Sequence, residues 1–150
     1  MKLVSLLFIT SSLFLFIGCQ QEEDTSHLIE GEGIQVEGTW ARPGSEGRMS
    51  AAYFLITNFE EQADTLVSVE SDISQLVEIH ESYKQDEDMV GMREVGSVEI
   101  PGESTVRFEQ GGLHIMLIQL NQRLSDGDSF ELTLNFANHD NITLEIPVRR

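Results

Sequence analysis

Cysteine is almost absent from this chain of 150 residues: Cys19 is the only one, and none follows it. A domain that begins after Cys19 cannot build a blue-copper electron-transfer centre, because that centre needs a cysteine thiolate beside two imidazoles. Basic residues are also few, since 9 Lys and Arg stand against 26 Asp and Glu and give a formal net charge of −17. Such an acidic surface repels phosphate backbones, which excludes nucleic acid as a partner.

Two further patterns are missing from the sequence. No window of useful length shows an apolar period of 3.6 residues with helix caps, so α-helices are not expected in the domain. A nucleophile elbow or other catalytic motif is also absent. Asp64, His80 and Ser82 are the residue types of a hydrolase, but nothing else in the sequence supports catalysis, and the protein is predicted not to be an enzyme.

The N-terminus has the pattern of a secretory signal. Residues 1–18 carry Lys2 and an apolar segment that is too short for a membrane-spanning helix before polar residues follow. Cys19 directly after this segment resembles the lipobox of bacterial lipoproteins, whose cysteine is lipidated. The alternative is a plain secreted protein with one spare thiol. The sequence predicts a lipoprotein signal peptide (1–18), a lipidated Cys19 with a flexible acidic tether (19–33), and one domain (34–150). The domain is expected outside the cytoplasm, anchored by its lipid to a bacterial membrane and facing the periplasm.

From residue 34 onward the chain consists of β-prone runs separated by polar or glycine-containing turns. Residues 129–137, SFELTLNFA, alternate apolar and polar side chains and predict a half-buried strand. Residues 113–120, LHIMLIQL, are apolar on both faces and predict a central strand. Nine strands are expected, at 34–40, 50–58, 64–71, 76–83, 89–95, 104–109, 113–120, 129–137 and 141–148. This pattern predicts an all-β fold, a β-sandwich or a partly closed barrel.

His114 and Met116 lie two residues apart at the start of the apolar run. Side chains at i and i+2 of a strand point to the same face about 7 Å apart, so both can reach one small ligand such as a metal ion. His80 lies on the face of its strand that is opposite to the apolar residues, and Met92 follows Gly91, which permits a turn or bulge. The alternative interpretation is a core methionine and a hydrogen-bonded core histidine without a metal.

These donors select one kind of metal. Thioether sulfur is soft and matches Cu(I), whereas carboxylates suit Mg²⁺ or Ca²⁺ and imidazole alone suits Zn²⁺. Thioethers also avoid the disulfide formation that inactivates paired thiols outside the cytosol. The donor set therefore predicts a Cu(I) site at His80, Met92, His114 and Met116.

The spacing of these donors resembles the signature of a known family, the periplasmic Cu(I) chaperones of the PCu(A)C type. His80 and Glu81 are followed by ten residues, Met92, twenty-one residues and His114-Ile115-Met116. Glu81 stands where many members have an optional methionine. The segments TWARPG (39–44), AAYFLITN (51–58), VEIHES (77–82), GGLHIMLIQL (111–120) and IPV (146–148) extend the resemblance over nearly the whole domain.

The resemblance implies a cupredoxin-like fold of Greek-key type that carries one Cu(I) per domain as a monomer. It also implies delivery of copper to an acceptor, either the CuA site of cytochrome c oxidase subunit II or another copper chaperone. Two alternatives stay open: a periplasmic copper-buffering or resistance protein, and a metal-free β-sandwich lipoprotein that binds another ligand. Trp40, Tyr53 and Met49 are expected in the core, although Met49 is also considered as an extra donor.

Overall fold

The computed structural model describes residues 31–86 and 89–150, and these ranges form ten β-strands without a helix. The predicted signal peptide, Cys19 and most of the tether lie outside the described residues. Within these ranges, nothing qualifies as a helix long and apolar enough to cross a membrane. The strands are β1 (Ile34–Ala41), β2 (Ser50–Asn58), β3 (Asp64–Glu70), β4 (Ser74–Asp86), β5 (Met89–Glu94), β6 (Val98–Ile100), β7 (Ser104–Phe108), β8 (Leu113–Leu120), β9 (Ser129–Phe136) and β10 (Ile142–Pro147).

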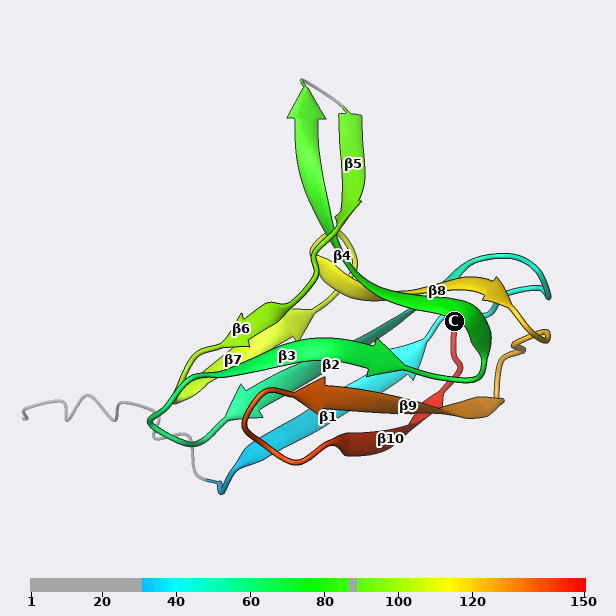
Figure 1. The fold of residues 1–150 in the computed structure, drawn as a ribbon. Helices are drawn as coiled ribbons and strands as arrows, with labels where there is room; N and C mark the ends of the chain where they lie inside the picture. Colours follow the sequence, from blue (N-terminus) through cyan, green and yellow to red (C-terminus); the bar gives the residue numbers. More distant parts are fainter. Residues whose placement is uncertain (1–30, 87–88) are drawn as a thin grey trace, which may run out of the picture.

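The strands form two sheets that face each other (Figure 1). One sheet has six strands in the order β1-β2-β7-β8-β4-β5, and the other has four in the order β10-β9-β3-β6. Strand β2 pairs with β8 through its first residues and with β7 through its last ones. A bridge between Ala41 and Val148 joins the two sheets at one edge, so the sandwich is partly closed.

Apolar side chains from both sheets fill the space between them. Alternate residues of β9 are buried, as the sequence pattern predicts, and Phe54 of β2 lies with its ring centroid 4.7 Å from that of Phe108 on β7. Both phenylalanines are almost completely buried. Burial of this apolar surface supplies the main driving force for folding. The predicted all-β sandwich is confirmed.

Nine of the ten strands match the sequence prediction within a few residues at each end. Strand β6 was not predicted, because three residues are too few to show alternation. Strand β4 is longer than expected, and its outer half forms with β5 a hairpin that projects beyond the rest of the larger sheet in Figure 1. Gly91 lies inside β5, not in a turn, and the register shift of the hairpin occurs between Lys84 and Asp86.

Strand β8 departs from simple alternation at its end. Simple alternation places Leu120 on the same face as Met116, but Gln119 has a φ of 56° and interrupts the strand pattern. Leu120 is therefore turned into the core cluster, where it is 2% exposed. A positive φ at a residue other than glycine is not visible in the sequence.

Asp64 at the start of β3 ties this strand to the turn between β9 and β10. One carboxylate oxygen accepts hydrogen bonds from the backbone amides of Thr65 (2.6 Å) and Asn138 (3.0 Å), and the other accepts from the amide of His139 (2.8 Å). Burial alone would raise the pKa of Asp64, but these hydrogen bonds outweigh burial and lower the pKa below its ordinary 3.8. The carboxylate thus links β3 to the turn between β9 and β10.

We expect Asp64→Asn to destabilise the domain by about 1–3 kcal/mol at pH 7, because an amide cannot accept all of these hydrogen bonds. Since the folded-state pKa is lowered, the stabilisation by Asp64 is present above the unfolded pKa of about 3.9 and is lost as the pH falls through the folded value. Urea unfolding at several pH values measures the difference. Asp140→Asn in the same turn is the control, and a difference that stays constant down to pH 3 would contradict the prediction.

Candidate metal centre

Two neighbouring strands bring the predicted donors together on the outer face of the larger sheet. In the antiparallel pair β4 and β8, His80 lies directly opposite His114, and Glu78 lies directly opposite Met116. Directly opposite residues share one face of a sheet. The centroids of the two imidazole rings are 5.9 Å apart. The register of this strand pair therefore brings His80, His114 and Met116 to one face of the sheet.

His114 is positioned by the turn that precedes β8. The turn contains Gly111 with a φ of 82°, and its ends are joined by the hydrogen bond from the amide of Glu109 to the carbonyl of Leu113 (2.7 Å). The Nδ1 atom of His114 is 3.0 Å from the carbonyl oxygen of Gly112, which can only accept a hydrogen bond. His114 is 5% exposed, so its ring is more deeply buried than a site on the rim would require.

His80 lies on the outer face as predicted, but its side chain is only 15% exposed. Its Nε2 atom is 2.7 Å from the Oε2 atom of Glu78. Among the described residues, its Nδ1 atom is the only buried side-chain nitrogen or oxygen that has no hydrogen-bond partner. A buried nitrogen without a partner is a candidate metal donor, because such groups are costly unless they gain a ligand.

A surface pocket of about 640 Å³ adjoins the imidazole pair. His114, Met116 and Met92 line it, and so does Met49 from the loop before β2. His80 does not line the pocket, but its ring centroid lies 5.9 Å from that of His114, which does. Met116 is half-buried, whereas Met92 and Met49 are 57% and 62% exposed. Met49 is therefore not a core residue, and that expectation is wrong.

Met92 reaches this side of the sheet through the projecting hairpin. It lies opposite Ser82, which is two residues after His80 and also lines the pocket. Gly91 permits this hairpin to pack closely, since a Cβ atom at this position would lie 2.7 Å from the ring of Tyr83. The spacing in the sequence predicts Met92 as a donor, but only the pairing of β4 with β5 explains its position.

The imidazole pair continues a row of rings across four strands. The ring centroids are 4.6 Å apart between Trp40 and Tyr53, 6.5 Å between Tyr53 and His114, and 5.9 Å between His114 and His80. Tyr53 is buried but is not part of the core cluster between the sheets, and Trp40 is only partly buried. The expected burial of Tyr53 is confirmed, although it lies outside that cluster, whereas the expectation that Trp40 is a core residue is wrong. Tyr53 and His114 of this row line the pocket, an arrangement that no sequence pattern predicted.

The residues fit a soft metal ion better than a hard one. Within the described ranges, no group of three or more His, Cys, Asp and Glu side chains is placed to hold a metal ion. The thioethers of Met92 and Met116 lie on the same side of the sheet as the two imidazoles, and a combination of thioether and imidazole donors suits Cu(I).

Comparison with known proteins identifies the family. Residues 34–148 match the model of the family described as "Putative lipoprotein LpqE-like". The chain is 26% identical over 120 residues to "Putative lipoprotein Lxx21020" of Leifsonia xyli, covering 80% of this chain and 72% of that one. It is 30% identical over 117 residues to "Uncharacterized protein RP573" of Rickettsia prowazekii, covering 73% of this chain and 62% of that one.

The fold is shared with solved PCuAC domains. The copper-bound PCuAC domain from PmoF2 superimposes with a TM-score of 0.67 at 24% identity, covering 79% of this chain and 93% of that domain. The Cu(I) form of DR1885 from Deinococcus radiodurans superimposes with a TM-score of 0.61 at 22% identity, covering 83% and 85%. The resemblance to PCu(A)C domains, and with it the cupredoxin-like fold, is confirmed. The chain belongs to the LpqE-like lipoprotein family.

Proposed function

We propose that this protein is an extracytoplasmic, non-catalytic carrier of Cu(I), with His80, Met92, His114 and Met116 as ligands. The observation that carries the proposal is the directly opposed pair His80 and His114 beside a pocket lined by Met92 and Met116. Two imidazoles and two thioethers form a neutral donor set, which suits a soft monovalent ion. The structural neighbours described as copper-bound support the proposal.

The transfer of copper would proceed by ligand exchange. The two imidazoles, of which His114 is buried and His80 mostly buried, would anchor the ion, while the exposed Met92 offers the side from which an acceptor can approach. A neutral donor set has no thiolate that would hold Cu(I) tightly, so release to a partner is favoured over permanent storage. The acidic chain, with its net charge of −17, would also attract cations over long range.

We further propose that Cys19 is the lipid anchor after removal of residues 1–18, and that residues 19–33 are a tether. The domain would act as a monomer at a bacterial membrane, facing the periplasm. The family name supports the lipoprotein assignment. The acceptor that we propose is the CuA site of cytochrome c oxidase subunit II, or another copper chaperone.

Two measurements test this function. Competition of the mature chain with a chromophoric Cu(I) chelator should show one tight equivalent. Incubation of the loaded protein with a purified CuA domain should then transfer copper to that domain. Tight binding without transfer to any copper protein would instead favour buffering or resistance. Absence of Cu(I) binding would leave a β-sandwich lipoprotein with another ligand.

The two exposed methionines of the pocket should differ in their effect on Cu(I). Met92→Leu nearly conserves the side-chain volume but removes a proposed ligand, and should raise the Kd for Cu(I) at least about tenfold, or ~1.4 kcal/mol. Met49→Leu is the matched control, and its effect should stay within about ±0.5 kcal/mol, as for most surface substitutions. The chelator competition measures both values. A larger loss of Cu(I) affinity in Met49→Leu than in Met92→Leu would show that Met49, and not Met92, is the ligand.

A further inference from the structure

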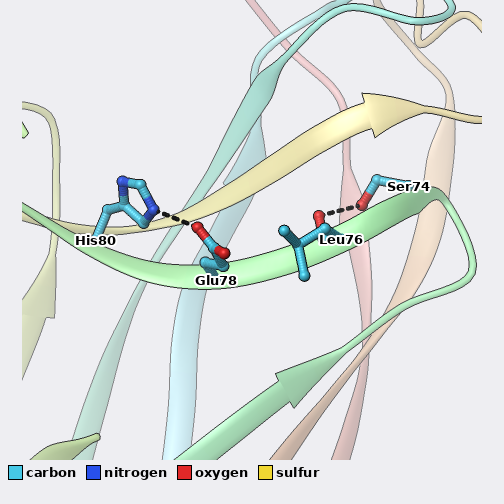
Figure 2. Close-up of polar contacts among 4 residues, drawn as sticks. All are labelled: Ser74, Leu76, Glu78 and His80. Carbon is cyan, nitrogen blue, oxygen red and sulfur yellow. Dashed lines mark hydrogen bonds and ion pairs between the residues drawn. The ribbon is translucent and has the colours of Figure 1, made fainter. Parts of the chain in front are cut away.

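Glu78 makes a mostly buried contact with one of the proposed ligands. Glu78 and His80 lie two residues apart on the same face of β4, and Figure 2 shows the carboxylate of Glu78 directed at the imidazole of His80. The Oε2 atom of Glu78 is 2.7 Å from the Nε2 atom of His80, and the two side chains are 21% and 15% exposed. A short contact that is shielded from water fixes the orientation of the ring.

This contact also determines which nitrogen of His80 carries the hydrogen. A carboxylate can only accept a hydrogen bond, so the geometry assigns the hydrogen of the neutral ring to Nε2. The lone pair is then on Nδ1, the buried atom that has no partner in residues 31–86 and 89–150. The nitrogen that Glu78 leaves free is therefore the one that can bind a metal ion.

His114 has the opposite arrangement. Its Nδ1 atom donates to the carbonyl oxygen of Gly112 at 3.0 Å, which leaves the lone pair on Nε2. In both rings, one nitrogen is thus hydrogen-bonded to the protein and the other is free to bind a metal ion. The hydrogen-bond acceptor for His114 is a neutral carbonyl group, whereas the acceptor for His80 is a carboxylate.

We propose that Glu78 is the positioning residue of the metal centre: it holds His80 as the Nε2–H tautomer so that Nδ1 binds the ion, while His114 binds through Nε2. This proposal rests on the proposed Cu(I) site. Glu78 also lies directly opposite Met116 in the strand pair, so its position in the sheet adjoins two of the proposed ligands. It supplies the negative charge that the neutral ligands lack, without binding the ion itself.

The first experiment examines the metal-free mature protein, independently of copper. Long-range ¹H–¹⁵N NMR of the imidazole rings distinguishes the two tautomers. We expect the Nε2–H form for His80 in the wild type and in Glu78→Gln, because the amide oxygen of Gln can still accept the hydrogen bond. We expect loss of this preference in Glu78→Ala. His114 should remain the Nδ1–H form in all three proteins.

The second experiment measures Cu(I) affinity of the same proteins by competition with a chromophoric chelator. Glu78→Ala should still bind one equivalent with a Kd raised about 10- to 100-fold, as is usual when a group that orients a metal ligand is removed. Glu78→Gln should lie between it and the wild type, since it keeps the orientation and loses the charge. Thermal unfolding of each metal-free variant shows whether the fold is intact.

Glu81→Gln is the matched control. Glu81 lies on the same strand, is more exposed at 38%, and pairs with Arg93 at 2.8 Å instead of with a proposed ligand. It should change neither the tautomer of His80 nor the Kd for Cu(I). Equal affinity and an unchanged tautomer in Glu78→Ala would overturn the positioning role alone. Absence of Cu(I) binding by the wild type would overturn the proposed function and, with it, this role for Glu78.

Discussion

Replacement of His114 by Ala together with Met116 by Leu is expected to abolish tight Cu(I) binding by this domain. The two side chains lie at neighbouring positions of one strand face, opposite His80 and Glu78, so the double variant removes half of the proposed ligands from one side of the site. Loss of two donors should weaken the affinity by at least about a hundredfold, or ~2.7 kcal/mol. Chelator competition measures this change, and circular dichroism verifies that the variant is folded.

The chain offers a control with the same two residue types. His139 lies in the turn between β9 and β10, and Met89 lies at the start of β5 outside the pocket lining. A His139→Ala/Met89→Leu variant removes one imidazole and one thioether but should bind Cu(I) like the wild type. If both double variants bind equally, the spacing of the donors does not define the site.

The fold was largely predictable because its strands carry a strong local signal. Alternating residues such as those of β9 are dictated by burial on one face, and the sequence shows this directly. The failures have a different origin. Strand β6 is too short for a pattern, and Leu120 changes face because of the φ of one residue, Gln119. Both features are fixed by tertiary packing.

The candidate site was predictable only in part, for a similar reason. Chemistry and spacing predicted four donors, but only the structure shows that His80 lies directly opposite His114. The pocket includes Tyr53 and Met49, which were assigned to the core because large apolar residues are usually buried there. Their position depends on the pairing of β2 with β8, which joins segments more than sixty residues apart. The sequence shows that Glu78 and His80 have the spacing of residues on one face of a strand. It does not show that their side chains are in contact.

Phe54→Ala should cause the largest loss of stability that we predict. Phe54 is 1% exposed in the centre of β2 and packs against Phe108, so the substitution should cost about 3–5 kcal/mol through lost burial and a new cavity. This is a large part of the ~5–15 kcal/mol that stabilises a typical domain. Urea unfolding measures the change, and Phe59→Ala, at a half-buried position, should cost clearly less.

The Phe54→Ala variant also tests whether the stability of the core is independent of Cu(I) binding at the proposed site. Phe54 belongs to the core between the sheets, whereas the imidazole pair lies on the outer face of the larger sheet. A ligand that binds only the folded state stabilises it by about 2.7 kcal/mol at a hundred times its Kd, and distant sites contribute additively. Cu(I) should therefore stabilise Phe54→Ala and the wild type by the same amount. Unfolding curves with and without Cu(I) test this, and a smaller increment in the variant would show that the core and the site are coupled.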